Sequence, residues 1–223
     1  MKTILAIGDL HLPWACQESL EKVYAFARKT QPDYIIQMGD LLDMYSYGRF
    51  PRTHCLLTPK EEIAQGRKMA EEFWREIKSA SPFSICHQLL GNHDERPAKK
   101  LFDKAPEFEP FFNFKSIFLF DEVITQPSAR EELVIQDIVF MHGYRSKIGD
   151  HAKHNGMNTV CGHLHRGGTV FQRLGNKTIW ELNAGFLADV SSIPLSYTQQ
   201  RKFAQYQKGI GWVDNFGPRF IPF

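Results

Sequence analysis

Cysteine is scarce in this chain of 223 residues, and no two cysteines form a Cys-x-x-Cys pair. The four cysteines are widely spaced, at Cys16, Cys55, Cys86 and Cys161. This spacing argues against a disulfide framework or a zinc ribbon, and it suits a reducing compartment. The chain also lacks any run approaching the ~18 apolar residues of a membrane helix, and its first apolar run is too short for a signal peptide. We therefore expect a cytoplasmic protein without a membrane partner.

A strong excess of charge of one sign is absent too. The net charge is +2, while 43% of the residues are hydrophobic and 23% are charged. This composition is globular rather than disordered, and it gives no global field that would attract nucleic acid or a membrane. The length suits one domain with a substantial core. We expect a single domain over residues 1–223, whose aromatic and basic tail, residues 199–223, docks on the core.

Apolar runs alternate with helical patterns along the chain. Runs typical of buried strands occur at 3–7, 34–38, 84–90, 116–120, 133–141 and 158–161. Helical patterns cover 17–30 and 59–79, and the second has Thr58 as N-cap and Glu61 to complete a capping box. Gly175-Asn176 is a strong hairpin turn and Gln136-Asp137 a weaker one. These patterns predict an α/β sandwich with antiparallel strands late in the chain.

Polar side chains suited to metal binding follow five of the predicted strands, each next to a glycine. In open α/β sheets, ligand sites collect at this edge. Carboxylate, imidazole and amide donors without thiolate suit divalent manganese, iron or zinc, and seven donors exceed one tetrahedral site. We therefore expect two divalent metal ions that share a carboxylate, with manganese favoured and iron, zinc or nickel as alternatives. The seven donors are Asp9, His11, Asp40, Asn92, His142, His163 and His165.

The same residues form five sequence blocks: Asp9-x-His11, Gly39-Asp40-x-x-Asp43, Gly91-Asn92-His93-Asp94, His142 and Gly162-His163-x-His165. In type and order, these blocks resemble the signature of the calcineurin-like metallophosphoesterases, over roughly residues 5 to 185. The resemblance implies a β-sandwich of mixed sheets flanked by helices, in αββα layers. It implies that Asp9, His11, Asp40 and His165 hold one ion, and that Asp40, Asn92, His142 and His163 hold the other. His93 would face the leaving-group oxygen as a catalytic residue, oriented by Asp43.

Two such ions imply a mechanism of phosphoester hydrolysis. Cations about 3.5–4 Å apart can clamp a phosphate and lower the pKa of a bridging water toward ~7, so that the hydroxide attacks phosphorus in line. His93 would donate a proton or hydrogen bond to the departing oxygen. One position departs from the family: Met44 follows Asp43, where an arginine is usual. Arg49 or Arg52 could supply the missing substrate contact.

Basic and aromatic residues form a rim after the motif strands, Arg96 among them, and suit a polyanion. We expect Asp94 to act only locally, in a salt bridge or at a helix start. We favour a phosphodiesterase of the nuclease type, acting on DNA or RNA. The alternative is a phosphomonoesterase for a small molecule or phosphoprotein, and a third hypothesis is an interaction module that has lost catalysis. Such a module should lack several donors, whereas every position is filled here. His151 and His154 fall in a short helical pattern, and we expect them to face solvent. The sequence does not fix the oligomeric state.

Overall fold

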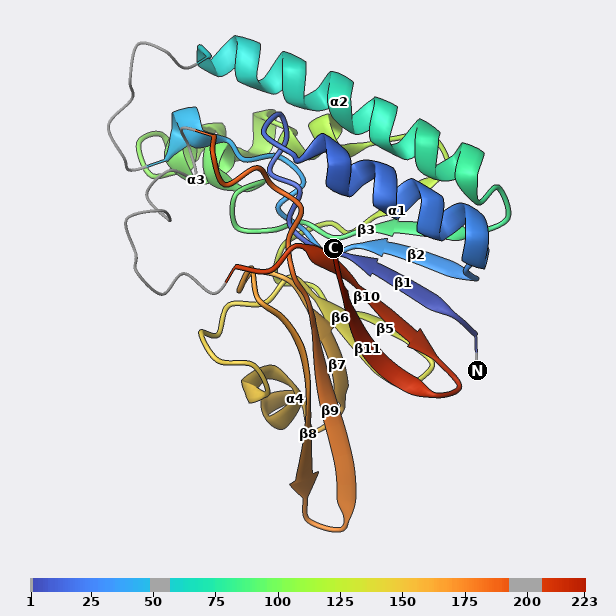
Figure 1. Ribbon diagram of the computed structural model, residues 1–223. Helices are drawn as coiled ribbons and strands as arrows, with labels where there is room; N and C mark the ends of the chain where they lie inside the picture. The colour runs from blue at the N-terminus through green and yellow to red at the C-terminus, as the bar shows by residue number, and fades with distance from the viewer. Residues whose placement is uncertain (1, 49–56, 193–205) are drawn as a thin grey trace.

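The computed structural model describes residues 2–48, 57–192 and 206–223. Two mixed sheets lie face to face (Figure 1). The first has the order β11-β10-β1-β2-β3-β4 and contains β1 (Ile4–Ile7), β2 (Tyr34–Gln37), β3 (Ile85–Gln88), β4 (Val123–Thr125), β10 (Gly209–Asp214) and β11 (Gly217–Pro222). The second has the order β5-β6-β7-β9-β8 and contains β5 (Leu133–Ile135), β6 (Ile138–Met141), β7 (Asn158–Cys161), β8 (Gly167–Leu174) and β9 (Lys177–Ala184).

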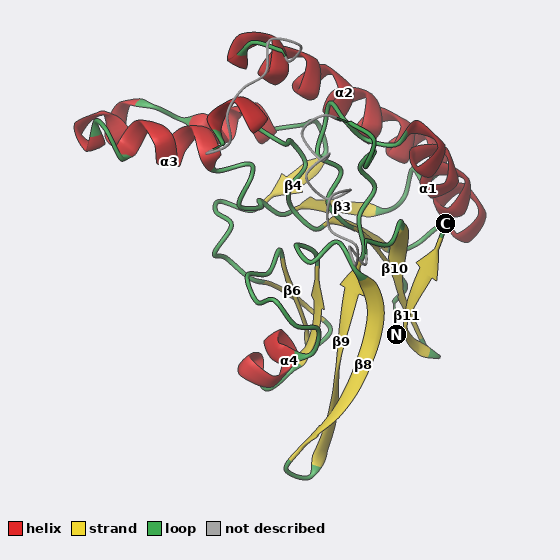
Figure 2. Ribbon diagram, turned by 60° about the vertical axis from the view of Figure 1, so that its left-hand side comes forward, coloured by secondary structure: helices red, strands yellow, loops and turns green. Residues whose placement is uncertain are grey.

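Helices lie on both outer sides of this sandwich. The long helices α1 (Gln17–Thr30) and α2 (Pro59–Ala80) run over the first sheet, and α4 (Asp150–Asn155) lies beside the second (Figure 2). Helix α3 (Arg96–Phe102) follows β3, and short 3-10 turns cover Tyr45–Tyr47, Pro106–Phe111 and Phe114–Phe118. This mixed α/β arrangement confirms the predicted fold class. None of the helices in the described ranges is long and apolar enough to cross a membrane.

Strand β1 shows how the core is divided. Successive side chains of a strand point to opposite faces of the sheet. Leu5 and Ile7 therefore pack with the helices, in a cluster that includes Val23 and Phe73. Ile4 and Ala6 pack instead against the second sheet, in a cluster that includes Phe140 and Leu182. Both faces of β1 are buried, which explains its uninterrupted apolar run.

Most of the predicted elements are present, and one is wrong. Helix α2 begins with the capping box of Thr58 and Glu61, and the hairpins β5–β6 and β8–β9 form with the expected register. The strand predicted at 116–120 is absent: Phe114–Phe118 is a 3-10 turn, and β4 at Val123–Thr125 pairs with β3 instead. The apolar run there reflects burial of Phe118 rather than pairing.

The C-terminal segment joins the first sheet. Strand β10 pairs antiparallel with β1, and β11 pairs with β10. Ile210 and Trp212 thereby enter the core beneath the helices. This holds for residues 206–223, whereas the first part of the predicted tail, 199–205, lies outside the described residues. The extent of the domain stays a prediction.

Candidate metal centre

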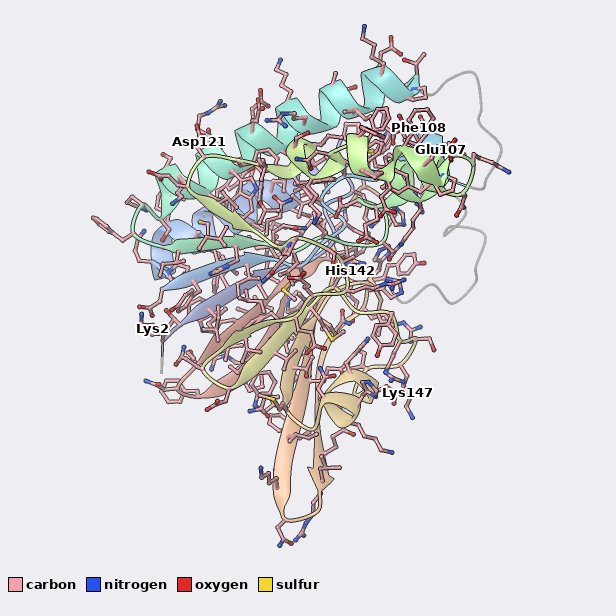
Figure 3. The ribbon with its side chains drawn as sticks, turned by 180° about the vertical axis from the view of Figure 1, so that it is seen from behind. Lys2, Glu107, Phe108, Asp121, His142 and Lys147 are labelled. Carbon is pink, nitrogen blue, oxygen red and sulfur yellow. The ribbon has the colours of Figure 1, made fainter. Side chains whose placement is uncertain are left out.

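Five loops meet where the two sheets face each other. Strands β1, β2 and β3 are parallel neighbours, and so are β6 and β7 in the other sheet. The loops that follow their carboxyl ends carry all seven proposed metal ligands, and Figure 3 shows His142 between the sheets. The structure therefore brings together side chains that span more than 150 positions of sequence, from Asp9 to His165.

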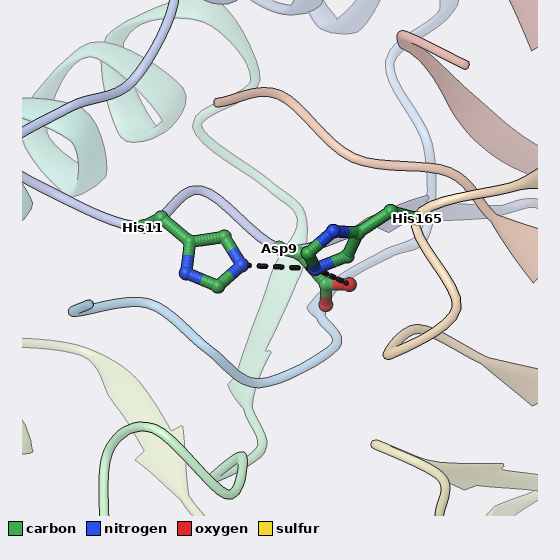
Figure 4. A group of neighbouring side chains, drawn as sticks. All are labelled: Asp9, His11 and His165. Carbon is green, nitrogen blue, oxygen red and sulfur yellow. Dashed lines mark hydrogen bonds and ion pairs between the residues drawn. The ribbon is translucent and has the colours of Figure 1, made fainter. Parts of the chain in front are cut away.

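One group of donors consists of Asp9, His11 and His165, all buried (Figure 4). The Nε2 atoms of His11 and His165 are 3.0 Å apart. The Nε2 atom of His165 is 3.4 Å from Asp9 Oδ2. His165 is held in this orientation by stacking on Phe186, with a ring-centroid distance of 5.2 Å.

The second group surrounds Asn92. Its Oδ1 atom is 3.0 Å from His142 Nε2 and 2.9 Å from His163 Nδ1. Asp40 Oδ2 lies 3.3 Å from the same His142 nitrogen. On the other side, Asp40 Oδ2 is 3.9 Å from His11 Nε2, in the first group. Asp40 is thus the carboxylate between the two groups, which is where a bridging ligand has to be.

The donor set fits divalent cations. Both carboxylate oxygens of Asp9 are buried without a hydrogen-bond partner among the described residues, although an unpaired buried carboxylate is costly. Ligand atoms about 2.0–2.2 Å from one ion are separated by roughly 3.0–3.5 Å. Five of the donor separations, 2.9 to 3.4 Å, are of this size, and that between Asp40 and His11 is 3.9 Å. The donor set and its spacing therefore fit two divalent ions.

The backbone is strained at four of the proposed ligands. His11, Asp40, His163 and His165 have φ values of 51°, 50°, 66° and 56°. This left-handed region costs a residue other than glycine roughly 1–2 kcal/mol, and such strain concentrates at functional sites. Glycines give room beside the donors. A Cβ on Gly162 would lie 2.6 Å from Asp9 Oδ1, and one on Gly39 would lie 2.7 Å from His142 Nδ1.

Burial dominates the electrostatics of the metal-free site. It raises the pKa of Asp9 to about 7 and, with His142 nearby, lowers the pKa of His163 to about 4. Burial also lowers the pKa of His165 well below its ordinary value. Burial would lower the pKa of His142 as well, but the carboxylates of Asp40 and Asp9 outweigh it and raise that pKa to about 10. Bound cations would displace the protons that Asp9 and His142 retain, since metal ligands must be deprotonated.

Neighbouring groups fix the orientation of the donors. His142 Nδ1 donates to the carbonyl of Met38 at 2.9 Å, which directs Nε2 at Asn92 and Asp40. Asp94, expected to act only locally, accepts hydrogen bonds from the backbone N–H groups of Leu41, Leu42 and Gly91 at 2.8 to 3.3 Å. It therefore ties the second sequence block to the third.

His93 lies at the edge of this site with Asp43 beside it. His93 Nδ1 donates to the Asp43 carbonyl at 3.0 Å and is 3.7 Å from the carboxylate. That carboxylate also binds His11 Nδ1 at 3.1 Å, so Asp43 contacts both a proposed ligand and the proposed acid. Burial would raise the pKa of Asp43, but His11 and His93 hold it well below its ordinary value.

Sequence reasoning missed the part played by Arg96, which it placed among the basic residues of the rim. Its Nη1 donates to the Asp43 carbonyl at 2.9 Å, and its Nη2 donates to His93 Nε2 at 2.7 Å. The guanidinium of Arg96 thus contacts Asp43, although Met44 occupies the position where an arginine is usual. The signal was the spacing: Arg96 follows His93 by three positions, and the turn that joins them is closed by a hydrogen bond from Arg96 N to His93 O. Arg49 and Arg52 lie outside the described residues.

The expected exposure of the other histidines is confirmed for His154 and wrong for His151. His151 is buried because its Nε2 accepts hydrogen bonds from the backbone N–H groups of Tyr144 and Arg145, each at 3.0 Å. The backbone N–H of His151 donates to Glu181 Oε2, on β9, at 2.8 Å. The short helical pattern could not reveal partners on a distant strand.

Comparison with known proteins agrees with this geometry. A model of the family described as calcineurin-like phosphoesterase matches residues 2–193, and the chain therefore belongs to that family. The gene 54 proteins of Mycobacterium phages L5 and D29 are each 28% identical to it, covering 96% and 97% of this chain and 87% and 88% of their own lengths. The Vps29 structure from Chaetomium thermophilum covers 100% of this chain and 96% of its own, at 12% identity and a TM-score of 0.50. YfcE, a phosphoesterase from E. coli, covers 96% of this chain and 88% of its own, at 14% identity and a TM-score of 0.45.

Proposed function

We propose that the protein is a two-metal phosphoester hydrolase that acts on phosphodiesters, with nucleic acid as the favoured substrate. The observation that carries this proposal is that the six other proposed metal ligands lie around Asp40, with the Asp9 oxygens left without a hydrogen-bond partner among the described residues. When bound, two divalent cations would activate a water molecule as nucleophile and neutralise charge on the phosphate. Manganese as the native metal and a cytoplasmic location stay predictions from the sequence.

Residues of the chain would position the two halves of the site and donate a proton to the leaving group. Asp40 would hold the two halves of the site in register, and Asp43 would orient both His11 and His93. His93 accepts a hydrogen bond from Arg96 at Nε2. To donate to a leaving oxygen, His93 has to exchange this contact, which frees the Arg96 guanidinium to bind a phosphate oxygen. Arg96 would then supply the positive charge that an arginine usually provides in this family, at the position that Met44 occupies here.

One cavity at the site, and a second beside the residue that follows His165, support a diester. A diester carries a group on each side of phosphorus, whereas a monoester needs room on one side only. A cavity of about 430 Å³ adjoins Asn92 and His142. A second, of about 480 Å³, is lined by Arg166, which follows His165, and by Lys147. Figure 3 shows Lys147 below His142, toward the second sheet. These basic residues suit the next phosphate of a polyanion.

The test is a comparison of substrates after reconstitution with manganese, iron, zinc or nickel. Bis-p-nitrophenyl phosphate and single- or double-stranded DNA should be hydrolysed faster than p-nitrophenyl phosphate. Faster turnover of the monoester would favour the phosphomonoesterase instead. A protein that takes up no metal and hydrolyses none of these substrates would be the interaction module.

Asp40→Asn provides the matched control, because it keeps the shape of the side chain and removes the shared negative charge. It should abolish hydrolysis of every substrate that the wild-type protein accepts. Near-normal turnover by this variant would refute the proposed bridging role.

A further inference from the structure

The cavity beside Asn92 and His142 has a wall of unusual chemistry for a phosphate-binding site. Its lining combines one exposed aromatic ring, Tyr144, with two cations, Lys99 and Arg130, and two carboxylates, Glu95 and Glu132. Ala129 and Met141 add apolar surface. The formal charges cancel, so this cavity is a poor place for a second phosphate. Its volume of about 430 Å³ lies within the ~300–1,000 Å³ typical of ligand pockets.

Buried hydrogen bonds fix the backbone of the loop that carries Tyr144. The backbone N–H groups of Tyr144 and Arg145 both donate to the buried Nε2 of His151. Glu181 in turn binds the backbone N–H groups of His151 and Ala152 at 2.8 and 2.9 Å. This buried network anchors a loop whose Tyr144 side chain is 60% exposed. The buried network thus fixes the place at which this exposed ring lines the cavity.

The ring is also arranged to stack. The Arg145 guanidinium lies 5.1 Å from the centroid of Tyr144, and the His151 ring meets it at 5.3 Å and 89°. The guanidinium lies over one face of the ring and donates to the Tyr144 hydroxyl at 3.4 Å, and the residue is still 60% exposed. Aromatic side chains held in this way serve as platforms for nucleobases, because every base has a π face.

We propose that this cavity is a nucleobase subsite for the group esterified to the phosphate, with Tyr144 as the stacking platform. The inference rests on the proposed phosphodiesterase function and names its substrate class, a nucleotidyl ester. A base is neutral, flat and edged with donors and acceptors. The cavity offers an aromatic face together with Arg130, Glu132 and the ion pair of Lys99 with Glu95 at 3.0 Å. Its place beside Asn92 and His142 would put the base next to the phosphate.

The test compares two ligands that differ only in the base. Both are phosphonates with a methylene group in place of the bridging oxygen, so neither can be hydrolysed: one is the analogue of thymidine 5′-phosphate, the other that of 1,2-dideoxyribose 5-phosphate, which carries hydrogen in place of the base. Their dissociation constants are measured by calorimetry on the metal-loaded protein. The thymidine analogue should bind roughly 5- to 150-fold more tightly, which is the range expected for one stacked base.

Variants of Tyr144 test whether its ring causes the preference for the thymidine analogue. Tyr144→Ala should bring the ratio of the two constants close to one, whereas Tyr144→Phe, which keeps the ring, should preserve it. The anchoring contacts of residue 144 come from its backbone, so the alanine variant retains them. Phe171→Ala is the matched control, because Phe171 on β8 is also 60% exposed and does not line this cavity. That variant should keep the wild-type ratio.

The possible outcomes distinguish failure of the nucleobase subsite from failure of the proposed hydrolase function. If the base-free ligand binds and bis-p-nitrophenyl phosphate is hydrolysed, but the ratio is near one or survives Tyr144→Ala, the nucleobase subsite is refuted and the hydrolase stands. If neither ligand binds and no ester is cleaved, both are refuted. Where the preference holds, hydrolysis of an oligonucleotide and of a dinucleotide identifies the source: a faster oligonucleotide indicates a nucleic-acid strand, and equal rates indicate free nucleotides.

Discussion

Replacing Asp9 by asparagine should change the stability of the metal-free and the metal-loaded protein in opposite directions. In the metal-free state burial raises the pKa of Asp9 from 3.8 to about 7. At 1.36 kcal/mol per pKa unit, keeping this carboxylate ionised at pH 7 costs the folded state about 4 kcal/mol. Asparagine removes the charge but leaves a buried amide without a partner, which costs about 1–3 kcal/mol. Metal-free Asp9→Asn should therefore be about 1–3 kcal/mol more stable than wild type.

The effect has a defined pH window. The folded-state pKa of Asp9 is raised, so the folded protein binds this proton more tightly than the unfolded chain between pH 3.8 and about 7. The contribution of Asp9 to metal-free stability is accordingly present at low pH and is lost as the pH rises through that window. The advantage of Asp9→Asn should be large at pH 7 and small near pH 4.

Urea unfolding measures both states, with a chelator and with manganese. In manganese the order should reverse, because the variant loses a charged ligand and with it the stabilisation by bound metal. Asp94→Asn is the matched control: burial also raises the pKa of Asp94 to about 7, but three backbone N–H groups bind its carboxylate. It should destabilise the metal-free protein. Equal destabilisation of both states by Asp9→Asn would refute the reasoning.

Three further predictions concern single side chains. His93→Ala should slow hydrolysis of esters with poor leaving groups, by about 10²–10⁴-fold, far more than that of p-nitrophenyl esters; equal losses in steady-state assays would contradict its role as general acid. Arg96→Ala should lower kcat/KM by about 10- to 150-fold, the worth of a hydrogen bond to a charged group, and Arg96→Lys should recover part of the loss; an unchanged kcat/KM would exclude a phosphate contact. Thr58→Ala removes the capping box of α2 and should cost about 1 kcal/mol of unfolding free energy, with metal content unaltered; no change in urea unfolding would show that the cap is dispensable.

The seven proposed ligands could be found from the sequence because their signal is local. Each lies after an apolar run and near a glycine, and parallel strands bring such ends to one edge. Arg96 was counted only among the basic residues after the motif strands and Asp94 was given only a local part, because their partners Asp43 and Leu42 are about fifty positions away in the sequence. His151 was misjudged for the same reason, since Glu181 lies thirty positions on.

The errors in secondary structure have a related cause. The run at 116–120 is as apolar as a buried strand, and periodicity does not distinguish a short strand from a buried turn. The pairing of β10 with β1 joins opposite ends of the chain, and the aromatic tail gave no register for it. Helix α2 was predicted almost to the residue, because its cap and its apolar stripe both lie within the segment.

Anomalous diffraction from crystals of the manganese-reconstituted protein tests the central claim most directly. Two peaks are predicted in each molecule, one beside Asp9, His11 and His165 and the other beside Asn92, His142 and His163, with Asp40 in contact with both. A fully reconstituted protein with no peak at this place, or with a single ion that leaves Asp9 unbound, would contradict the two-metal account.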